Sequence, residues 1–441
     1  MRRMKAKSSD AIGLPRGAIR RITAPVRNFL AVESASGIVL LICTAVALAL
    51  ANSPLAKDVH DFWEMPVELS FATWSLKLSL HHVVNDGLMT LFFFVVGLEI
   101  KRELVAGELS TPQKAAFPVI AALGGMIAPA GLYFALQYGT PGESGWGIPM
   151  ATDIAFVVGV LAVFGPRVPF SLKVFLLSLA IADDIGAILV IAIAYSGTPN
   201  WLALGAATLG FSLCYTLNRL GVRTIGIYLL VGIGIWFAVL KSGIHPTIAG
   251  VLLGLLTPAS AWISTPTLQN ALSTAFGRVT DGSIDHDDLQ RLVFASREAT
   301  SPLERLVHIL HPWVGFIVMP LFAFANAGVP LRLSDVRDPV AIAVAIGLVI
   351  GKPLGIVGFC FLAVKLGIAR LPTGMNWKLL AAAGCLGGIG FTMSLFIAEL
   401  ALQVQLLDAG KFGILLGSGI SAAVGSGFMV WGLRGLKPTK A

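Results

Sequence analysis

Two adjacent carboxylates lie at the centre of the stretch Leu179-Ala180-Ile181-Ala182-Asp183-Asp184-Ile185-Gly186-Ala187-Ile188-Leu189. The surrounding residues, from Val174 to Tyr195, are almost all apolar and are numerous enough to cross a bilayer as a helix. An aspartate at the centre of a membrane helix costs roughly 2.5–3.5 kcal/mol, so the pair costs about 5–7 kcal/mol. Apolar residues would pack there without this cost. We therefore expect an intramembrane site for protons or cations, with a structural salt bridge as the alternative.

The composition indicates a polytopic membrane protein with one large membrane domain. Of the 441 residues, 56% are hydrophobic and 13% are charged, and the mean hydropathy is +0.82. Soluble domains typically contain about 25% charged residues. The net charge of +8 does not indicate nucleic-acid binding, because the basic residues lie in short loops and at the two ends. The four cysteines lie singly in apolar runs, which indicates neither a metal site nor a disulfide framework.

Hydropathy predicts twelve membrane-spanning helices. They cover residues 36–52, 84–104, 115–137, 147–165, 172–195, 201–218, 224–240, 244–257, 311–328, 340–364, 379–402 and 411–433. The side that holds the N-terminus, with both tails, carries 25 lysines and arginines, the other side carries six, and Lys352 lies inside the tenth span. Because cytoplasmic loops hold the excess of these residues, we expect both termini to be cytoplasmic.

Four segments lie outside the predicted membrane domain or project from it. Residues 1–30 carry eight lysines and arginines and a single acid, and they form a basic cytoplasmic tail before the membrane domain at 31–435. Residues 436–441 form a short cytoplasmic tail. Residues 66–78 alternate between apolar and polar side chains on either side of Ala72-Thr73, which is typical of a β-hairpin.

The fourth segment is a long cytoplasmic loop at residues 258–310. It contains an acidic cluster, followed by a stretch, Leu289 to Ala299, with the pattern of an amphipathic helix. A solvated loop of variable sequence is the favoured interpretation. The acidic residues are Asp281, Asp285, Asp287 and Asp288.

Three further spans contain residues that hydrophobicity does not explain. The fourth span contains Pro149 and Thr152-Asp153, and the eleventh contains the glycine-rich run Gly384 to Thr392. Such spans are candidate broken helices, whose freed carbonyl groups and half-helix ends face an ion. The tenth span contains Gly351-Lys352-Pro353, with a lysine in an apolar run.

Helix geometry divides the roles of the two aspartates. Neighbours on a helix point about 100° apart, so one aspartate can bind a cation while the other pairs with a base. Lys352 is the base that lies in the interior of a predicted span, away from the span ends, so it is the expected partner of one aspartate. This argument leaves open which aspartate it contacts. At about 4 Å the attraction is roughly 4 kcal/mol, similar in size to the cost of burial, so we expect the pair to exchange protons near physiological pH.

A second group of charges lies at the inner end of the second span. Glu99, Arg102 and Glu103 have the spacing of one helical face, and His308 and His311 lie near the start of the ninth span on the same side. These residues either anchor the helices at the interface or sense cytoplasmic pH, because histidine titrates near pH 6.5. For each histidine singly, the interfacial role is favoured.

Seven short motifs carry a family resemblance. They are Val96-Gly97-Leu98-Glu99-Ile100-Lys101-Arg102-Glu103-Leu104, Ala151-Thr152-Asp153-Ile154-Ala155, Asp183-Asp184-Ile185-Gly186-Ala187, His311-Pro312-Trp313, Leu321-Phe322-Ala323-Phe324-Ala325-Asn326-Ala327-Gly328, Gly351-Lys352-Pro353-Leu354-Gly355 and Gly390-Phe391-Thr392-Met393-Ser394. With them the chain resembles the NhaA family of bacterial sodium/proton antiporters over about residues 30–435, apart from an insert at 258–304.

The resemblance implies an all-α fold of twelve transmembrane helices, with inverted repeats that relate spans three to five to spans ten to twelve, and with an extracytoplasmic hairpin. The broken fourth and eleventh helices would cross near the midplane. Asp184 would bind Na⁺ or Li⁺, and Asp183 would pair with Lys352. The rest of the ion-binding region would be the crossing, formed by Thr152, Asp153 and the backbone around Gly388, Gly390 and Thr392. Asp153 would balance the dipole ends of the half-helices there.

The resemblance also implies how the protein is regulated and assembled. Glu99, Arg102, Glu103, His308 and His311 would form a pH-sensing funnel. Residues 66–78 would build a homodimer by strand addition. The expected protein is an electrogenic, pH-regulated transporter in the lipid of the bacterial inner membrane, not an enzyme, with Na⁺, Li⁺ and H⁺ as partners and with neither cofactor nor nucleic acid. One departure is Val307, where the family pattern leads us to expect a carboxylate; Glu304 stands one turn earlier.

Two other classes of function place carboxylates in membranes. An intramembrane aspartyl protease needs aspartates on two helices facing one water, and Asp153 with Asp183 or Asp184 could supply them. Neither motif contains Gly-x-Gly-Asp, however, and Lys352 has no part in that chemistry. A cation channel needs a continuous polar file, which the sixth and seventh spans do not provide. Antiport is therefore favoured over a channel or another cation carrier.

Overall fold

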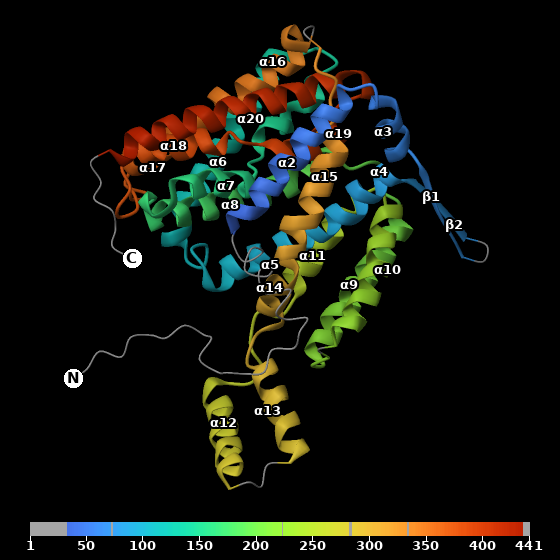
Figure 1. Ribbon diagram of the computed structural model, residues 1–441, viewed down its shortest axis with the longest axis vertical. Coiled ribbons are helices and arrows are strands. Elements are labelled where there is room, and N and C mark those ends of the chain that lie inside the picture. The colour runs from blue at the N-terminus through green and yellow to red at the C-terminus, as the bar shows by residue number, and fades with distance from the viewer. Residues whose placement is uncertain (1–32, 72–73, 223, 282–284, 333–334, 435–441) are drawn as a thin grey trace.

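The fold is almost entirely helical (Figure 1), and a computed structural model describes residues 33–71, 74–222, 224–281, 285–332 and 335–434. Within these residues, seven helices are long and apolar enough to cross a membrane, or up to nine if each of two bent pairs is one span. The expectation of a polytopic, mostly helical membrane protein is confirmed. Each of the twelve predicted stretches overlaps a helix, but twelve crossing helices and their inverted repeat stay predictions. The two predicted tails lie outside the described residues.

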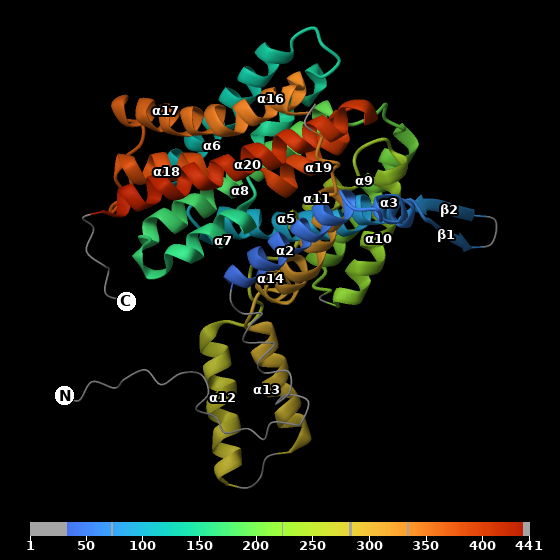
Figure 2. The ribbon, with the colours of Figure 1, turned by 45° about the horizontal axis from the view of Figure 1, so that its top comes forward.

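The chain begins with a bent helix pair and a two-stranded sheet. Helices α2 (Glu33–Ala51) and α3 (Ala56–Trp63) meet at 116°. Strands β1 (Pro66–Phe71) and β2 (Trp74–Ser79) are antiparallel, with Pro66 opposite Ser79. The hairpin predicted at 66–78 is therefore present, although its centre, Ala72-Thr73, lies outside the described residues. Figures 1 and 2 show that the sheet projects from the helical body.

The remaining helices follow in chain order. They are α4 (Leu80–His82), η1 (Val83–Leu88), α5 (Met89–Ala106), α6 (Pro112–Gln137), η2 (Glu143–Met150), α7 (Ile154–Phe164), η3 (Gly165–Arg167), α8 (Phe170–Ala194), α9 (Trp201–Arg219), α10 (Ile225–Lys241), α11 (Thr247–Leu256), α12 (Thr265–Thr280), α13 (His286–Glu298), α14 (Pro302–Trp313), η4 (Val314–Val318), α15 (Met319–Asn326), η5 (Asp335–Arg337), α16 (Pro339–Ile346), η6 (Gly347–Gly351), α17 (Lys352–Lys365), α18 (Trp377–Gly387), α19 (Phe391–Ala401) and α20 (Val404–Leu433).

Two spans are interrupted near their middle, at the places where the sequence suggests broken helices. The first passes from η2 to α7 through residues 151–153, and the second passes from α18 to α19 through Gly388–Gly390 with a bend of 43°. Non-helical backbone at membrane depth is tolerated only where protein surrounds it. Both breaks meet this condition, because Ala151, Asp153 and Ile389 are at most 1% exposed.

The favoured interpretation of residues 258–310 as a solvated loop is wrong, because most of the segment is helical: α12 and α13 form a hairpin, and the ninth span begins at Pro302 instead of residue 311. The helix predicted from Leu289 to Ala299 is present in α13, which ends at Glu298. The start of α14 has a local cause, because the hydroxyl of Ser301 accepts a hydrogen bond from the backbone N–H of Glu304 (3.2 Å) and proline occupies the first turn. This combination is a strong helix start.

Small residues permit the close contact between α5 and α11. A Cβ atom placed on Gly97 would lie 2.5 Å from the carbonyl oxygen of Val251, and one on Gly254 would lie 2.6 Å from that of Phe94. Helices in membranes approach closely where such residues face each other. This contact holds the helix that carries Glu99 against its neighbour.

We predict that Gly254→Ala lowers the thermal stability of the detergent-solubilised protein, because the new methyl group has no space. Overpacking of this kind costs about 1–3 kcal/mol. The matched control is Gly205→Ala in α9, where nothing lies within 4 Å of an added Cβ. The check is a comparison of unfolding midpoints; equal midpoints for the two variants would contradict the close contact.

Candidate functional site

The centre of the site is a buried ion pair between α8 and the start of α17. The ammonium group of Lys352 contacts Oδ2 of Asp183 and also the backbone carbonyl oxygen of Met150. Both charged side chains have 0% exposure. The lysine therefore contacts Asp183 and not Asp184, which is the pairing that the family resemblance implies.

The broken helices supply the polar backbone groups around this pair. Because α7 begins only at Ile154, the carbonyl group of Met150 is free to accept from Lys352. The hydroxyl of Thr152 lies 2.7 Å from Oδ2 of Asp183 and 2.9 Å from the carbonyl oxygen of Gly387, which ends α18. The two breaks thus meet at the ion pair.

Close packing of α16, η6 and α17 brings Lys352 to this position. Proline at residue 353 has no backbone N–H, and the preceding turn, η6, is a wider π-helix. A Cβ atom on Gly351 would lie 2.6 Å from the Cα atom of Pro129, and one on Gly347 would lie 2.7 Å from Cβ of Pro149. Glycine at both positions lets this helix approach α6 and the first break.

Asp153 connects the two half-helices that begin at the breaks. Its Oδ1 atom accepts from the backbone N–H of Phe156 at the start of α7 (3.1 Å). Its Oδ2 atom accepts from the backbone N–H of Thr392 near the start of α19 (3.1 Å) and from the hydroxyl of Thr392. A carboxylate is favoured at helix N-termini, where unpaired N–H groups carry partial positive charge. One buried aspartate therefore caps two helices.

Asp184 differs from its neighbour in its surroundings. It is 8% exposed, whereas Asp183 is 1% exposed. Among the described residues, no hydrogen bond or ion pair is recorded for the Asp184 carboxylate, and Oδ1 of Asp183 is buried without a partner. Carboxylate oxygens are the ligands that hard cations prefer. The site therefore offers oxygen ligands beside an already neutralised pair.

The predicted pH-sensing residues are brought together only in part. Nε2 of His311 in α14 lies 3.7 Å from Oε1 of Glu99 in α5. Glu103 turns back over its own helix end, where its Oε2 atom accepts from the backbone N–H of Glu108 (2.9 Å). Arg102 is half-buried and His308 is exposed, and neither has a recorded polar contact within the described part of the chain.

Val307 occupies an apolar contact. It is 7% exposed and packs with Leu98 of α5 and Leu303 of its own helix. A carboxylate at this position would have to be buried among these side chains. The departure from the family pattern is therefore accommodated by local packing.

Sequence analysis missed a second buried ion pair, between α19 and α20. Nζ of Lys411 lies 2.5 Å from Oε1 of Glu399, and the two side chains are 10% and 16% exposed. The signal was visible, since Glu399 falls within the eleventh predicted span and Lys411 at the start of the twelfth. Ser418 of α20 was also missed; its hydroxyl accepts from the backbone N–H of Phe391 (3.2 Å), which adds a second cap at the start of α19.

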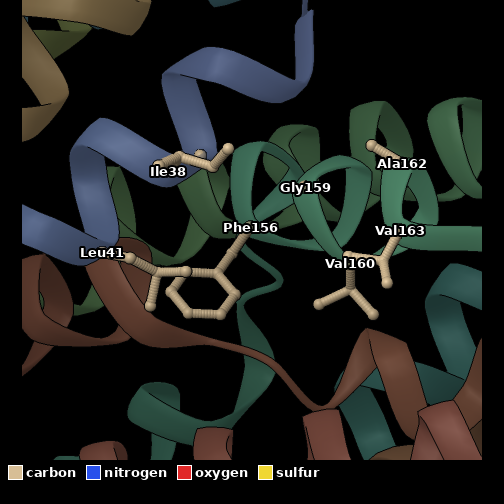
Figure 3. Close-up of a pocket in the computed structure, with 8 residues that line it drawn as sticks. Ile38, Leu41, Phe156, Gly159, Val160, Ala162 and Val163 are labelled. Atoms are coloured by element: carbon tan, nitrogen blue, oxygen red, sulfur yellow. The ribbon is translucent and has the colours of Figure 1, made fainter.

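A cavity of about 300 Å³ opens between α2 and α7 but does not contain the aspartates (Figure 3). Its walls are apolar side chains and glycines, so it offers a cation no side-chain oxygen ligand. The ring of Phe156 lines it, and that ring contacts Phe391 on the side of the crossing (5.4 Å between ring centroids). The lining residues are Gly37, Ile38, Leu41, Phe156, Gly159, Val160, Ala162 and Val163.

Comparisons with known proteins identify the family of the chain. The family model described as Na⁺/H⁺ antiporter 1 matches residues 27–429. The chain is 51% identical to the Na⁺/H⁺ antiporter NhaA of Rhizobium meliloti (strain 1021) over 417 residues, which cover 93% of this chain and 95% of the relative. It is 49% identical to the NhaA antiporter of Rhodopirellula baltica over 437 residues, with 97% and 98% covered. It is 47% identical to an antiporter named NhaA 2 of Vibrio vulnificus over 429 residues, with 96% of each covered. The chain therefore belongs to the Na⁺/H⁺ antiporter 1 family.

Proposed function

We propose that the protein exchanges Na⁺ or Li⁺ for H⁺ across the bacterial inner membrane, with Asp184 as the cation ligand. Family membership supports sodium/proton exchange across a membrane. The observation that carries the residue assignment is the unequal partnering of the two aspartates. Asp183 already holds Lys352 and Thr152, whereas Asp184 has no recorded partner among the described residues.

Competition between sodium and protons for this one site is enough to couple the movement of the two ions. Asp184 and the partnerless Oδ1 atom of Asp183 hold either a proton or a sodium ion, because both would compete for the same oxygen atoms. High proton activity expels sodium, and high sodium displaces protons. If the site opens to one side at a time, each ion moves only in exchange for the other, and no second pathway is needed. The scheme breaks no covalent bond and uses no cofactor, so the protein acts as a transporter and not as an enzyme.

Lys352 makes the exchange sensitive to membrane potential. Sodium arriving beside Asp183 weakens the contact between this carboxylate and Lys352, and the lysine then releases a proton. When more than one proton moves per sodium ion, net charge crosses the membrane. Each such charge contributes about 2.3 kcal/mol per 100 mV of potential. Electrogenic exchange follows from this step.

Asp153 acts in this scheme as a positioning residue. Both of its oxygen atoms already accept hydrogen bonds from α7 and α19. Its charge offsets the partial positive charge of two helix N-termini that would otherwise face the cation. Thr152 positions Asp183 from the same break, through its hydroxyl.

The contact between Glu99 and His311 is the proposed pH-sensitive element. A protonated imidazole carries a positive charge and attracts a nearby carboxylate, whereas a neutral imidazole does not. The two residues join α5 to α14, so a change in this attraction acts between the two helices. We propose that this contact and both termini lie on the cytoplasmic side of the membrane.

The β1–β2 hairpin is the proposed dimer contact. A two-stranded sheet has outer edges whose backbone groups can pair with another strand. Within the hairpin, Nζ of Lys77 lies 3.3 Å from Oε2 of Glu68, and both side chains are exposed. Because strand addition uses backbone groups, it does not depend on these two side chains.

We predict that Asp184→Asn abolishes exchange, because an amide supplies a neutral oxygen and no titratable charge. The measurement is Na⁺- and Li⁺-driven proton movement in inverted vesicles across pH, at equal expression. The matched control is Asp408→Asn, an exposed aspartate in α20. Exchange by Asp184→Asn at half or more of the wild-type rate would rule out this residue as the ligand.

We predict that Lys352→Ala leaves exchange weak, or confines it to more alkaline pH, because Asp183 loses the charge that stabilises its ionised form. The variant should also be less stable, since breaking a buried ion pair typically costs about 3–5 kcal/mol. The control is Lys365→Ala, at the exposed end of the same helix. A pH profile and a response to imposed potential that both match wild type would assign Lys352 a purely structural role.

We predict that deleting residues 66–78 weakens dimerisation but leaves each protomer able to transport. The control is the double variant Glu68→Gln/Lys77→Gln, which keeps the strand backbone and should remain dimeric. Chemical cross-linking in membranes measures the dimer fraction of the deletion variant and of the double variant. Undiminished dimers in the deletion variant would refute the hairpin contact.

A further inference from the structure

The helical hairpin α12–α13 lies outside the membrane helices. Figures 1 and 2 both show these two helices side by side and extending away from the rest of the molecule. Their common seam contains Ala275 and Ala295, which are 8% and 6% exposed. Nη1 of Arg278 lies 2.5 Å from Oδ1 of Asp288 across it, and this hydrogen bond holds the pKa of Asp288 below its usual range.

One side of this hairpin is apolar and exposed. Phe276 follows the seam residue Ala275 of α12, and Leu272 lies one turn before Phe276. Leu289 follows Asp288, which reaches Arg278 across the seam, and Val293 lies one turn after Leu289 in α13. In two antiparallel helices, the residue after a seam position lies on the same side of the pair, because each residue advances about 100° around its helix. The side chains of Leu272, Phe276, Leu289 and Val293 are 47%, 70%, 47% and 67% exposed, respectively. They form one apolar face that spans both helices.

The tip of the hairpin is acidic. Asp281 follows α12, and Asp285 and Asp287 lie at the start of α13. Within the described residues, Asp288 pairs with Arg278, and Oδ1 of Asp285 caps α13 by accepting from the backbone N–H of Asp288 (2.8 Å). This cap leaves Asp285 charged, so that it adds to the negative charge of Asp281 and Asp287 at the tip. Asp285 lies four residues before Leu289, on the apolar side of the hairpin.

The N-terminal segment of the same chain has the complementary composition. Residues 1–30 carry eight lysines and arginines against one acid. Ile19, Ile22 and Val26 are interleaved there with basic residues. A basic segment with apolar residues at this spacing matches a surface that is apolar along its length and acidic at its end.

The N-terminal segment also ends close enough to the hairpin, and is long enough, to reach it. The described chain starts at Glu33, and a Cβ atom on Gly315 would lie 3.1 Å from Cβ of Ser36, so the segment leaves beside η4. From Gly315, the helix α14 leads back over about 20 Å to Pro302, where a short connection joins it to α13. A chain of 32 residues reaches up to about 100 Å, which is sufficient to cover the hairpin.

We propose that residues 1–30 bind the α12–α13 hairpin of their own chain. Ile19, Ile22 and Val26 cover the apolar face, and the basic side chains lie at the acidic tip. The bound segment would join α2, at whose start it ends, to α14, which carries His311. The interaction would connect the N-terminus to the helix of the proposed pH-sensitive contact.

The test is site-specific photo-cross-linking of the full-length protein in native membranes. A benzophenone amino acid replaces Phe276 on the apolar face or, as the matched control, Thr274, which lies about 200° away around the same helix. Mass spectrometry then identifies the captured peptide. We expect the Phe276 variant to capture residues 1–32 of the same chain, well above the Thr274 variant. Capture of lipid or of a second copy, or no capture above the control, would overturn the proposal.

A charge variant tests the acidic tip independently. Replacing Asp281, Asp285 and Asp287 by Asn keeps the helix cap, since Asn also caps helices. It should lower the yield of the Phe276 cross-link by about fivefold, the loss expected when several exposed charge pairs are removed. The control removes three exposed acids from α3, through Asp58→Asn, Asp61→Asn and Glu64→Gln, and should leave the yield unchanged. An equal loss in both variants, or in neither, would contradict binding at the tip.

Discussion

A lysine that is fully buried in a membrane protein has to be compensated on all sides, and the centre of this structure follows from that constraint. Lys352 has no exposed surface and contacts both a carboxylate and a backbone carbonyl. The carboxylate comes from α8, and the carbonyl, that of Met150, is available because the next helix begins four residues later. The ion pair and the helix break therefore depend on each other: continuous helix would bury the carbonyl in its own hydrogen bond, and without the lysine Asp183 would be an unpaired charge.

Asp153, the aspartate at the helix crossing, is likewise compensated by the groups around it. Two half-helices begin close together, and each presents backbone N–H groups to the region that accepts the cation in the proposed scheme. Asp153 accepts from both, and Ser418 adds a bond at the start of α19. Asp153 and Asp183 are held by protein groups, and Asp184 is therefore the carboxylate that we propose as the ion ligand. The different roles proposed for Asp153, Asp183 and Asp184 thus follow from the hydrogen-bond donors that the helix breaks place beside each carboxylate.

Two hairpins, β1–β2 and α12–α13, lie outside the membrane helices and expose surfaces of a different kind. The β1–β2 hairpin exposes sheet edges, and the α12–α13 hairpin exposes an apolar face and an acidic tip. Among the described residues of the two hairpins, none has a hydrogen bond or ion pair with the aspartates, and the proposals give these hairpins roles outside ion transfer. Their chain connections still matter, because α13 leads directly into α14, which meets α5 through His311 and Glu99.

The sequence by itself determined the membrane class, the intramembrane acids and lysine, the β-hairpin and the positions of both helix breaks. These features depend on local properties: the length of apolar runs, the cost of a buried charge, alternation along a strand, and glycine or proline within a span. Only the tertiary structure decided that Lys352 meets Asp183, since adjacent helical residues point in different directions and packing selects between them. It also decided which backbone N–H groups Asp153 accepts from, that Glu399 pairs with Lys411 and that Val307 is an apolar contact. Those contacts join segments far apart in the chain or depend on which helix faces which, and no local pattern contains that information.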